Sequence, residues 1–147
     1  MNRQRATAVI LENRKVLLFH RVRGGKEYEV FPGGGVEAGE TYEDALVREV
    51  KEELTLDVIT YELIATLRNL PAPAQSGFET NLLDTNVFLV TNYHGVPELG
   101  GPEKEKMTPD NQYIIEWIAV ETLPLLPDIY PQGIVDVVLK HLNSQTS

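Results

Sequence analysis

The sequence has no cysteine among its 147 residues and only three histidines. Disulfide bonds, thiolate catalysis, sulfur-bound structural zinc and iron–sulfur clusters are therefore excluded. Any metal ion must bind to oxygen atoms or to the scattered histidines. The absence of cysteine suits a cytoplasmic location, which we expect for this chain.

Long hydrophobic runs are also missing. No stretch approaches the roughly 20 consecutive apolar residues of a membrane-spanning helix. Residues 1–5 lead into a short strand-like run, without the apolar core and cleavage site of a signal peptide. We therefore expect neither membrane insertion nor export. The length and the 42% hydrophobic content predict one globular domain over residues 1–147, with a frayed tail at residues 143–147.

Basic residues are scarce in one part of the chain. Residues 27–62 hold 11 acidic and two basic residues, so this segment carries a net charge of −9, equal to that of the whole protein. Residues 1–26 instead hold seven Lys or Arg and a single acid, Glu12. This separation disfavours binding of polymeric nucleic acid, which needs a broad basic surface. It favours a site that gathers cations beside groups able to hold phosphate.

The early basic residues are open to two interpretations. Arg5, Arg21, Arg23 and Lys26 lie on or after the first predicted strands. They either hold a polyphosphate substrate or are solvated surface charges. We carry Arg5, Arg21 and Arg23 forward as candidate substrate-binding residues.

β-rich runs and helical patterns both occur along the chain. The predicted strands cover residues 5–11, 15–22, 28–31, 56–67, 85–93 and 113–120, with a hairpin at residues 12–14 and a glycine loop at residues 33–35. A final helix is expected from about Pro131 to about Leu142. The long connections at residues 69–84 and 95–112 are either substrate-shaping loops or ordinary surface loops.

A central helix is predicted to begin after Thr41 and to run to about Leu54. Thr41 is a good N-cap, and Asp44 follows three residues later, as in a capping box. Apolar residues recur at every fourth position on one face of this helix, namely Tyr42, Leu46, Val50 and Leu54. The spacing therefore predicts an amphipathic helix.

Three carboxylates share the edge next to that apolar face. Glu49, Glu52 and Glu53 are three and four residues apart, so they repel one another on a helix surface. Glu52 and Glu53 also lie in the last turn, where the helix dipole favours cations. This edge is either a solvated acidic face or a site for a divalent cation. A bound cation would offset both the repulsion between the carboxylates and their unfavourable interaction with the helix dipole.

The spacing around these glutamates resembles the signature of the Nudix hydrolase family, to which MutT-like enzymes belong. The signature, G-x5-E-x7-R-E-U-x-E-E-x-G-U with U aliphatic, spans residues 34–56, and only its second glycine is replaced, by Thr55. The matching residues are Gly34, Glu40, Arg48, Glu49, Val50, Glu52, Glu53 and Leu56. Phe31-Pro32-Gly33 and the strand order extend the resemblance over most of the chain.

The resemblance implies an α/β/α sandwich in which a mixed β-sheet supports a loop–helix–loop motif. It also implies that Glu49 and Glu53 bind Mg²⁺, that Glu52 is a further ligand or the base that activates water, and that the Gly33 carbonyl contacts the metal. Arg48 and Glu40 would orient these ligands. Oxygen ligands independently suit Mg²⁺ or Mn²⁺, which retain waters and bind substrate phosphates.

The resemblance also bears on a fourth carboxylate and on the end of the helix. Such sites often have a fourth carboxylate from a late loop, for which we select Glu103, with Glu98 and Glu105 as competitors. Thr55 replaces a glycine that would turn the chain through positive φ, so we expect an altered or slightly longer helix end.

The expected activity is Mg²⁺-dependent hydrolysis of a nucleoside diphosphate linked to another moiety, with a nucleoside triphosphate as the first choice. ADP-ribose or a nucleotide sugar is the alternative substrate class. A non-catalytic Nudix-fold binding module is the alternative of another class, which the intact motif glutamates disfavour. Substrate choice resides in variable loops, and the sequence leaves homodimer formation open.

The three histidines and the single tryptophan are predicted to have structural roles. His20, His94 and His141 show no metal-ligand spacing, and each is predicted to be a surface or strand histidine. Trp117 is predicted to be a core residue, with a platform for base stacking as the alternative.

Overall fold

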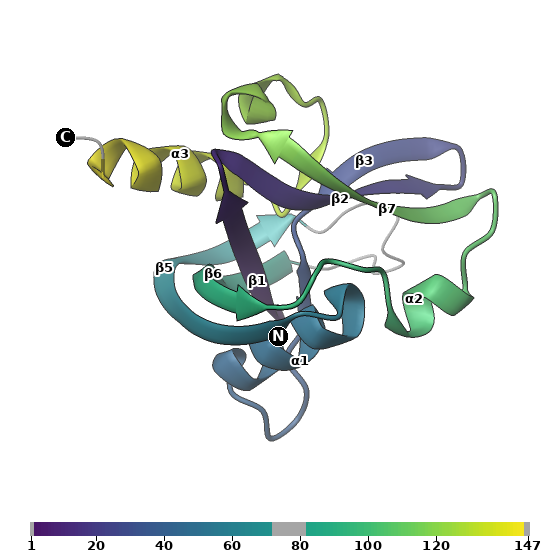
Figure 1. The fold of residues 1–147 in the computed structure, drawn as a ribbon, viewed down its shortest axis with the longest axis horizontal. Helices are drawn as coiled ribbons and strands as arrows, with labels where there is room; N and C mark the ends of the chain where they lie inside the picture. Colours follow the sequence, from purple (N-terminus) through teal and green to yellow (C-terminus); the bar gives the residue numbers. More distant parts are fainter. Residues whose placement is uncertain (1, 72–81, 146–147) are drawn as a thin grey trace.

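The computed structural model describes residues 2–71 and 82–145 (Figure 1). Within this part, the strands form two twisted layers that meet at the β1–β2 hairpin. The first layer contains β5 (Asp57–Pro71), β6 (Leu82–His94), β1 (Arg3–Glu12) and β4 (Gly33–Gly35), side by side in that order. β1 runs parallel to β6, and the other pairs are antiparallel. The sheet is therefore mixed, as predicted.

The second layer is built around β2. It contains β7 (Asn111–Ala119), β2 (Lys15–Arg23), β3 (Lys26–Val30) and β8 (Ile129–Tyr130). β2 is joined to β1 by a tight turn in which Asn13 and Arg14 both have positive φ, at 53° and 60°. This turn chemistry matches a two-residue hairpin loop. The predicted hairpin is confirmed.

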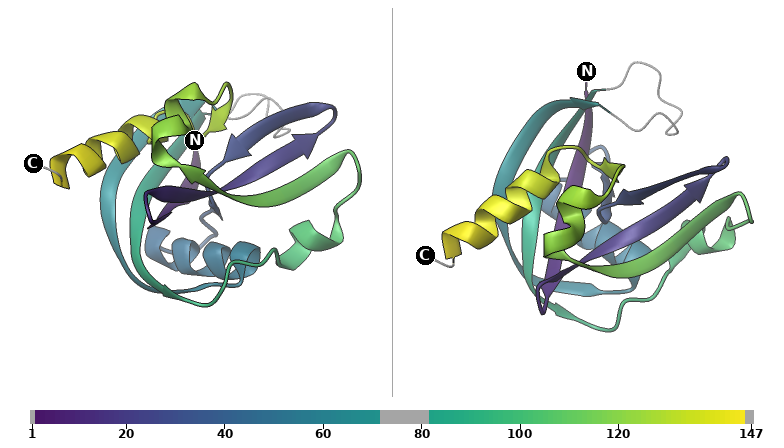
Figure 2. Two further views of the ribbon diagram at one scale, coloured as in Figure 1. Left: turned by 45° about the horizontal axis from the view of Figure 1, so that its top comes forward. Right: turned by 90° about the horizontal axis from the view of Figure 1, so that it is seen from above.

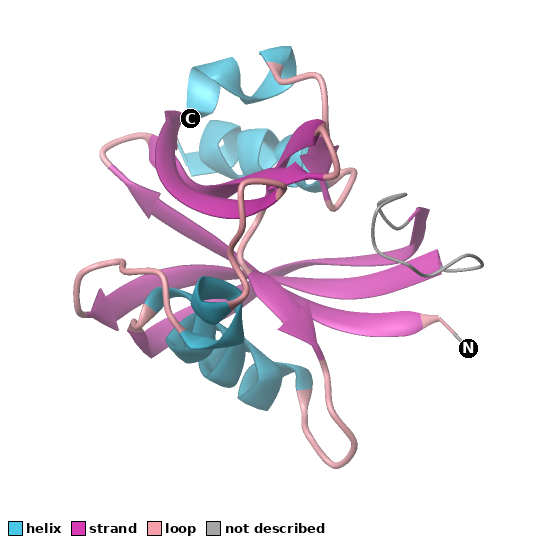
Figure 3. Ribbon diagram, turned by 90° about the vertical axis from the view of Figure 1, so that its right-hand side faces the viewer, coloured by secondary structure: helices cyan, strands magenta, loops and turns pink. Residues whose placement is uncertain are grey.

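Helices cover both faces of these strands, as Figures 2 and 3 show. The helical elements are α1 (Tyr42–Leu54), α2 (Gly101–Glu105), the 3₁₀ helix η2 (Val120–Leu125) and α3 (Ile134–Gln145). Ala6, Ala8 and Ile10 of β1 pack in one buried cluster with α1, whereas Val9 packs in a second cluster with η2 and α3. Alternation along β1 thus separates two cores, and the predicted α/β/α sandwich is confirmed.

The predicted central helix agrees with α1 at both ends. Thr41 Oγ1 accepts a hydrogen bond from the Asp44 N–H at 3.0 Å, and the Asp44 carboxylate accepts one from the Thr41 N–H at 3.1 Å. Ala45, Leu46, Val50 and Leu54 are buried. The helix is therefore specified locally by its capping box and by its apolar stripe.

The expectation of an altered or longer helix end was wrong. The helix ends at Leu54, and Thr55 itself adopts the left-handed conformation, with φ 60° and ψ 29°. This conformation is unfavourable for a β-branched residue. Thr55 Oγ1 donates to the Glu98 carbonyl at 2.9 Å, and the Gly100 N–H donates to the Glu53 carbonyl at 3.1 Å. Contacts from residues 95–100 thus stabilise the left-handed turn at Thr55. A glycine could adopt this turn without such contacts.

Other local predictions also need correction. Residues 33–35, predicted as a loop, form β4 because their backbone pairs with Arg5, Ala6 and Thr7. The predicted frayed tail is helical up to Gln145. The predicted long loops are shorter, because β5 extends to Pro71, β6 begins at Leu82, and α2 occupies part of residues 95–112. Residues 72–81, 146 and 147 lie outside the described residues. In the described part of the chain, no helix has the length and apolarity of a membrane span.

Candidate active site

Arg48 is the central side chain of the motif. Its guanidinium donates to both carboxylate oxygens of Glu40, at 2.7 and 2.9 Å, and to the Gly35 carbonyl at 2.9 Å. The remaining nitrogen donates to Glu49 Oε1 at 2.9 Å and lies 3.4 Å from Glu52 Oε2. Arg48 therefore connects the loop before α1 to two of the three motif carboxylates, as the predicted orienting role of Arg48 and Glu40 requires.

Glu49 lies directly against the glycine strand. A Cβ atom placed on Gly34 would come within 2.5 Å of both carboxylate oxygens of Glu49. Any side chain at position 34 would occupy the space that this carboxylate uses. The glycine in the motif is thus explained by close approach of a carboxylate to the backbone of β4.

Glu53 reaches the same strand from the next turn of α1. Its Oε1 accepts a hydrogen bond from the Gly33 N–H at 2.9 Å. Glu52 is exposed, with 48% of its side chain accessible, whereas Glu49 and Glu53 are half-buried. Glu49 and Glu53 thus face Gly34 and Gly33 from one edge of α1.

Electrostatic effects differ among the motif residues. Burial raises the pKa of Glu49, and its contacts with Arg48 partly oppose that shift. Hydrogen bonds from Arg48 and from the Glu37 backbone lower the pKa of Glu40 to about 2. The hydrogen bond with Glu40 raises the pKa of Arg48, so the pair stays charged.

A cavity of about 180 Å³ opens beside Glu53 and Gly33. All three arginines predicted to bind substrate line it. The complete lining is Arg5, Phe19, Arg21, Arg23, Tyr28, Val30, Gly33, Glu53 and Tyr113. The structure therefore brings the basic N-terminal strands and the acidic helix to one cavity, which the charge separation in the sequence favoured.

The three arginines are held differently. Arg5 donates to the Phe31 carbonyl and to Thr7 Oγ1, and burial lowers its pKa while the charges of Glu53 and Glu49 oppose that shift. Arg21 is 5% exposed and donates to the Gln112 carbonyl at 2.7 Å and to Asn111 Oδ1 at 3.0 Å. Arg23 is exposed.

Two tyrosines of the cavity were missed in the sequence. Tyr28 and Tyr113 are the direct strand partners of Arg21 in β3 and β7, and the Arg21 guanidinium lies 3.5 Å from the centre of the Tyr113 ring. Such stacking is favourable for arginine. Only the pairing register of three strands brings these residues together, so the sequence contains no local signal for it.

Comparison with known proteins identifies the family. The NUDIX domain family model matches residues 1–135. The chain belongs to the NUDIX domain family. Oxidized purine nucleoside triphosphate hydrolases of Danio rerio and Mus musculus are each 30% identical to it, over 118 and 129 residues. The matched segments cover 79% and 84% of this chain and 65% and 69% of the relatives, so the chain spans about two thirds of their length.

Solved structures share the fold. The MutT NUDIX hydrolase from Burkholderia pseudomallei superimposes with a TM-score of 0.70 at 25% identity, covering 92% of this chain and 95% of that chain. The NUDIX domain of Shewanella oneidensis NrtR, solved with ADP ribose, has a TM-score of 0.69 at 15% identity and covers 97% of this chain and 89% of that chain. The second likeness shows the Nudix fold alone.

The candidates for a fourth Nudix carboxylate all lie close in sequence to α2. Glu98 is exposed, and its backbone is bound to the end of α1, since its N–H donates to the Leu54 carbonyl at 2.9 Å. Glu105 is exposed at the end of α2. The backbone of Glu103 belongs to α2, but its side chain lies outside the described part of the structure. The assignment of Glu103 stays a prediction.

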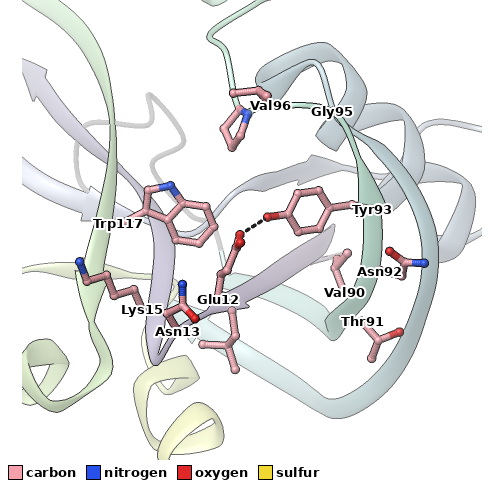
Figure 4. Close-up of a pocket in the computed structure, with 12 residues that line it drawn as sticks. Glu12, Asn13, Lys15, Val90, Thr91, Asn92, Tyr93, Gly95, Val96 and Trp117 are labelled. Atoms are coloured by element: carbon pink, nitrogen blue, oxygen red, sulfur yellow. Dashed lines mark hydrogen bonds between the residues drawn. The ribbon is translucent and has the colours of Figure 1, made fainter.

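A larger hollow of about 760 Å³ is lined by Glu12 at the end of β1 and by Gly95 and Val96 after β6 (Figure 4). Glu12, which lines it, is seven residues from Arg5, or about 23 Å along an extended strand. Trp117 lines this hollow and also packs against the core next to α1, so its predicted core position is confirmed in part. The Tyr93 hydroxyl donates to Glu12 there, and burial with this contact raises the pKa of Tyr93 to about 12. Trp117 does not line the cavity at the motif.

Proposed function

We propose that this protein is a divalent-cation-dependent pyrophosphohydrolase that cleaves a nucleoside diphosphate linked to another moiety, with a nucleoside triphosphate as substrate. The observation that supports this most strongly is the cavity in which Glu53 of the Nudix motif and the neighbouring Gly33 face Arg5, Arg21 and Arg23. Carboxylates on one side and cations on the other suit a metal-bound polyphosphate.

The residues present fit Mg²⁺ or Mn²⁺. Glu49, Glu52 and Glu53, together with the Gly33 carbonyl, provide only oxygen ligands, as these ions prefer. Gly34 also fits a metal site, because its lack of a side chain leaves room for the Glu49 carboxylate. When bound, the ion would neutralise phosphate charge and acidify a water molecule.

In the described residues, the motif carboxylates do not form a group whose ligand atoms all lie within 4.8 Å of one another. Arg48 holds Glu49 and Glu52, whereas the Gly33 N–H holds Glu53. Arg48 thus holds two of the three acidic side chains in place and partly balances their charge. Glu52, which is half exposed, is the motif carboxylate best able to accept a proton from solvent water.

The cations of the cavity divide into positioning and binding groups. Arg5 and Arg21 are occupied by protein acceptors, so they shape the wall and contribute positive charge. Arg23 is exposed at the same cavity and is the arginine best placed to contact a phosphate directly.

A nucleoside triphosphate is preferred because two relatives at 30% identity are named nucleoside triphosphate hydrolases. ADP-ribose or a nucleotide sugar is the second candidate, supported by the ADP ribose complex of a protein with the same fold. Substrate identity depends on groups around the cavity rather than on the fold.

Release of pyrophosphate or phosphate from a nucleotide panel tests the proposal. We expect turnover of at least one nucleoside triphosphate with Mg²⁺ or Mn²⁺ and loss of turnover in excess chelator. Preferential cleavage of ADP-ribose would select the second substrate class. Tight nucleotide binding without product from any panel member would show a non-catalytic binding module.

A further inference from the structure

A second cluster of metal-binding side chains lies on the opposite face of β2 from the active-site cavity. Phe19, Arg21 and Arg23 line that cavity, and His20, between them in sequence, points to the other face. His20 is the direct strand partner of Glu29 in β3. Glu116 of β7 pairs with Leu18, so it lies diagonally next to His20 on the same face.

The three side chains lie close enough to share one ion. One ligand atom each from His20, Glu29 and Glu116 lies within 4.8 Å of the others, and no other group of three meets this criterion in residues 2–71 and 82–145. His20 Nδ1 lies 2.6 Å from Glu29 Oε1, and His20 Nε2 lies 2.9 Å from Glu27 Oε1. His20 is a strand histidine, as predicted, and it shows no metal-ligand spacing in the sequence because strand pairing brings its partners together.

Glu29 is the most unusual member of the cluster. Its side chain is only 9% exposed, and its Oε2 atom is buried without a hydrogen-bond partner in the described structure. Buried carboxylate oxygens are normally satisfied, and an unsatisfied one is costly. The unpartnered oxygen belongs to the same carboxylate that contacts His20 through Oε1.

Protonation of His20 does not provide a hydrogen-bond donor for every buried carboxylate oxygen of this cluster. An imidazolium ring has two N–H groups, which would donate to Glu27 and to Glu29 Oε1. Glu29 Oε2, which is buried, would remain without a donor. A divalent cation can bind the imidazole and both carboxylates at once.

We propose that His20, Glu29 and Glu116 form a binding site for a divalent transition-metal ion such as Zn²⁺, separate from the motif. Imidazole with carboxylates favours such an ion over Mg²⁺, which prefers oxygen ligands alone. The ion replaces the proton between His20 Nδ1 and Glu29, and Glu27 holds the other ring nitrogen and orients the imidazole. The site lies across the sheet from the catalytic cavity, where it links β2, β3 and β7.

Zinc titration by calorimetry tests the site in the E49Q/E53Q background, which neutralises two of the three motif carboxylates. We expect one zinc ion per chain in this background. His20→Gln and Glu116→Gln should each weaken zinc binding at least tenfold. Glu116→Gln keeps the shape of the side chain and removes no hydrogen bond of the described structure, so this variant should fold normally. His141→Gln is the matched control on a histidine outside the cluster.

Cobalt(II) provides a spectroscopic check that His20 binds the metal ion. We expect a visible absorption band from bound cobalt that disappears in the His20→Gln variant and persists in the His141→Gln variant. Absence of zinc binding in the E49Q/E53Q background overturns the proposal, as does binding that neither His20→Gln nor Glu116→Gln weakens. Failure of the proposed hydrolase activity would not affect either measurement, because the motif is disabled in all these proteins.

Discussion

Arg48 and Glu40 form a two-point contact across the start of the motif helix. Nε and Nη2 of Arg48 donate to the two carboxylate oxygens of Glu40 at 2.7 and 2.9 Å, and the Glu37 N–H donates to the same carboxylate at 2.9 Å. This geometry fixes the plane of the guanidinium, which then reaches Glu49. Glu40 therefore acts on the candidate metal ligands through Arg48.

The Glu40 carboxylate should make the stability of the fold depend on pH in the acidic range. Because its pKa is lowered from 4.5 to about 2, its stabilising contribution is complete above pH 4.5 and is lost as the pH falls toward 2. The melting temperature of the wild type should therefore fall more steeply in this range than that of Glu40→Gln. Glu43→Gln, an exposed change on the same helix, is the control and should retain the wild-type slope. Equal slopes for Glu40→Gln and the wild type would contradict the prediction.

Substitution by alanine should have different effects at the adjacent residues Gly34 and Gly35. In Gly34→Ala the new methyl group meets the Glu49 carboxylate, whereas in Gly35→Ala the nearest atoms lie 3.9 Å away. We expect Gly34→Ala to lower activity and Mg²⁺ affinity about tenfold or more, since ligand-positioning changes have effects of this size. Gly35→Ala should remain close to wild type. Activity and metal titration of both variants check this, and equal behaviour would remove the proposed role of Gly34.

Glu53→Gln should separate function from stability. The amide oxygen can still accept from the Gly33 N–H, while one negative charge near the helix C-terminus is removed. We expect activity to fall at least about a hundredfold and the metal-free melting temperature to stay level or rise. Stabilisation by Mg²⁺ should also shrink, because a ligand oxygen has become neutral. Near-normal activity with an unchanged Mg²⁺ effect would contradict the metal assignment of Glu53.

Arg23→Ala and Arg21→Ala should have different consequences. Arg23 is exposed at the cavity, so its removal should raise KM several-fold with little change in kcat or melting temperature. Arg21→Ala removes a buried guanidinium bound by Gln112 and Asn111, so it should destabilise the fold by about 2 kcal/mol. Steady-state kinetics and thermal unfolding on both variants make the comparison. A stable Arg21→Ala protein with a raised KM would instead place Arg21 on the substrate.

Local sequence patterns were sufficient for the motif helix. Thr41 and Asp44 satisfy the first free backbone groups of α1, and the apolar repeat directs Leu46 and Val50 into the core. Both effects act over one or two helical turns, so they can be predicted without knowledge of the rest of the chain. The common edge of Glu49, Glu52 and Glu53 follows from the same helical period.

Contacts between distant segments required the tertiary structure. Gly33–Gly35 became a strand because β1 pairs with it, and Thr55 holds a left-handed turn because Glu98 and Gly100 bind the end of α1. The pairing of β2 with β3 and β7 places Arg21 between two tyrosines and, on the opposite face, places His20 beside Glu29. The sequence by itself thus determined the helix and its carboxylate edge, whereas tertiary structure decided what faces that edge. The physical reason is that strand register depends on hydrogen bonds and packing between residues far apart in the chain, and a shift of one residue would turn each side chain to the other face.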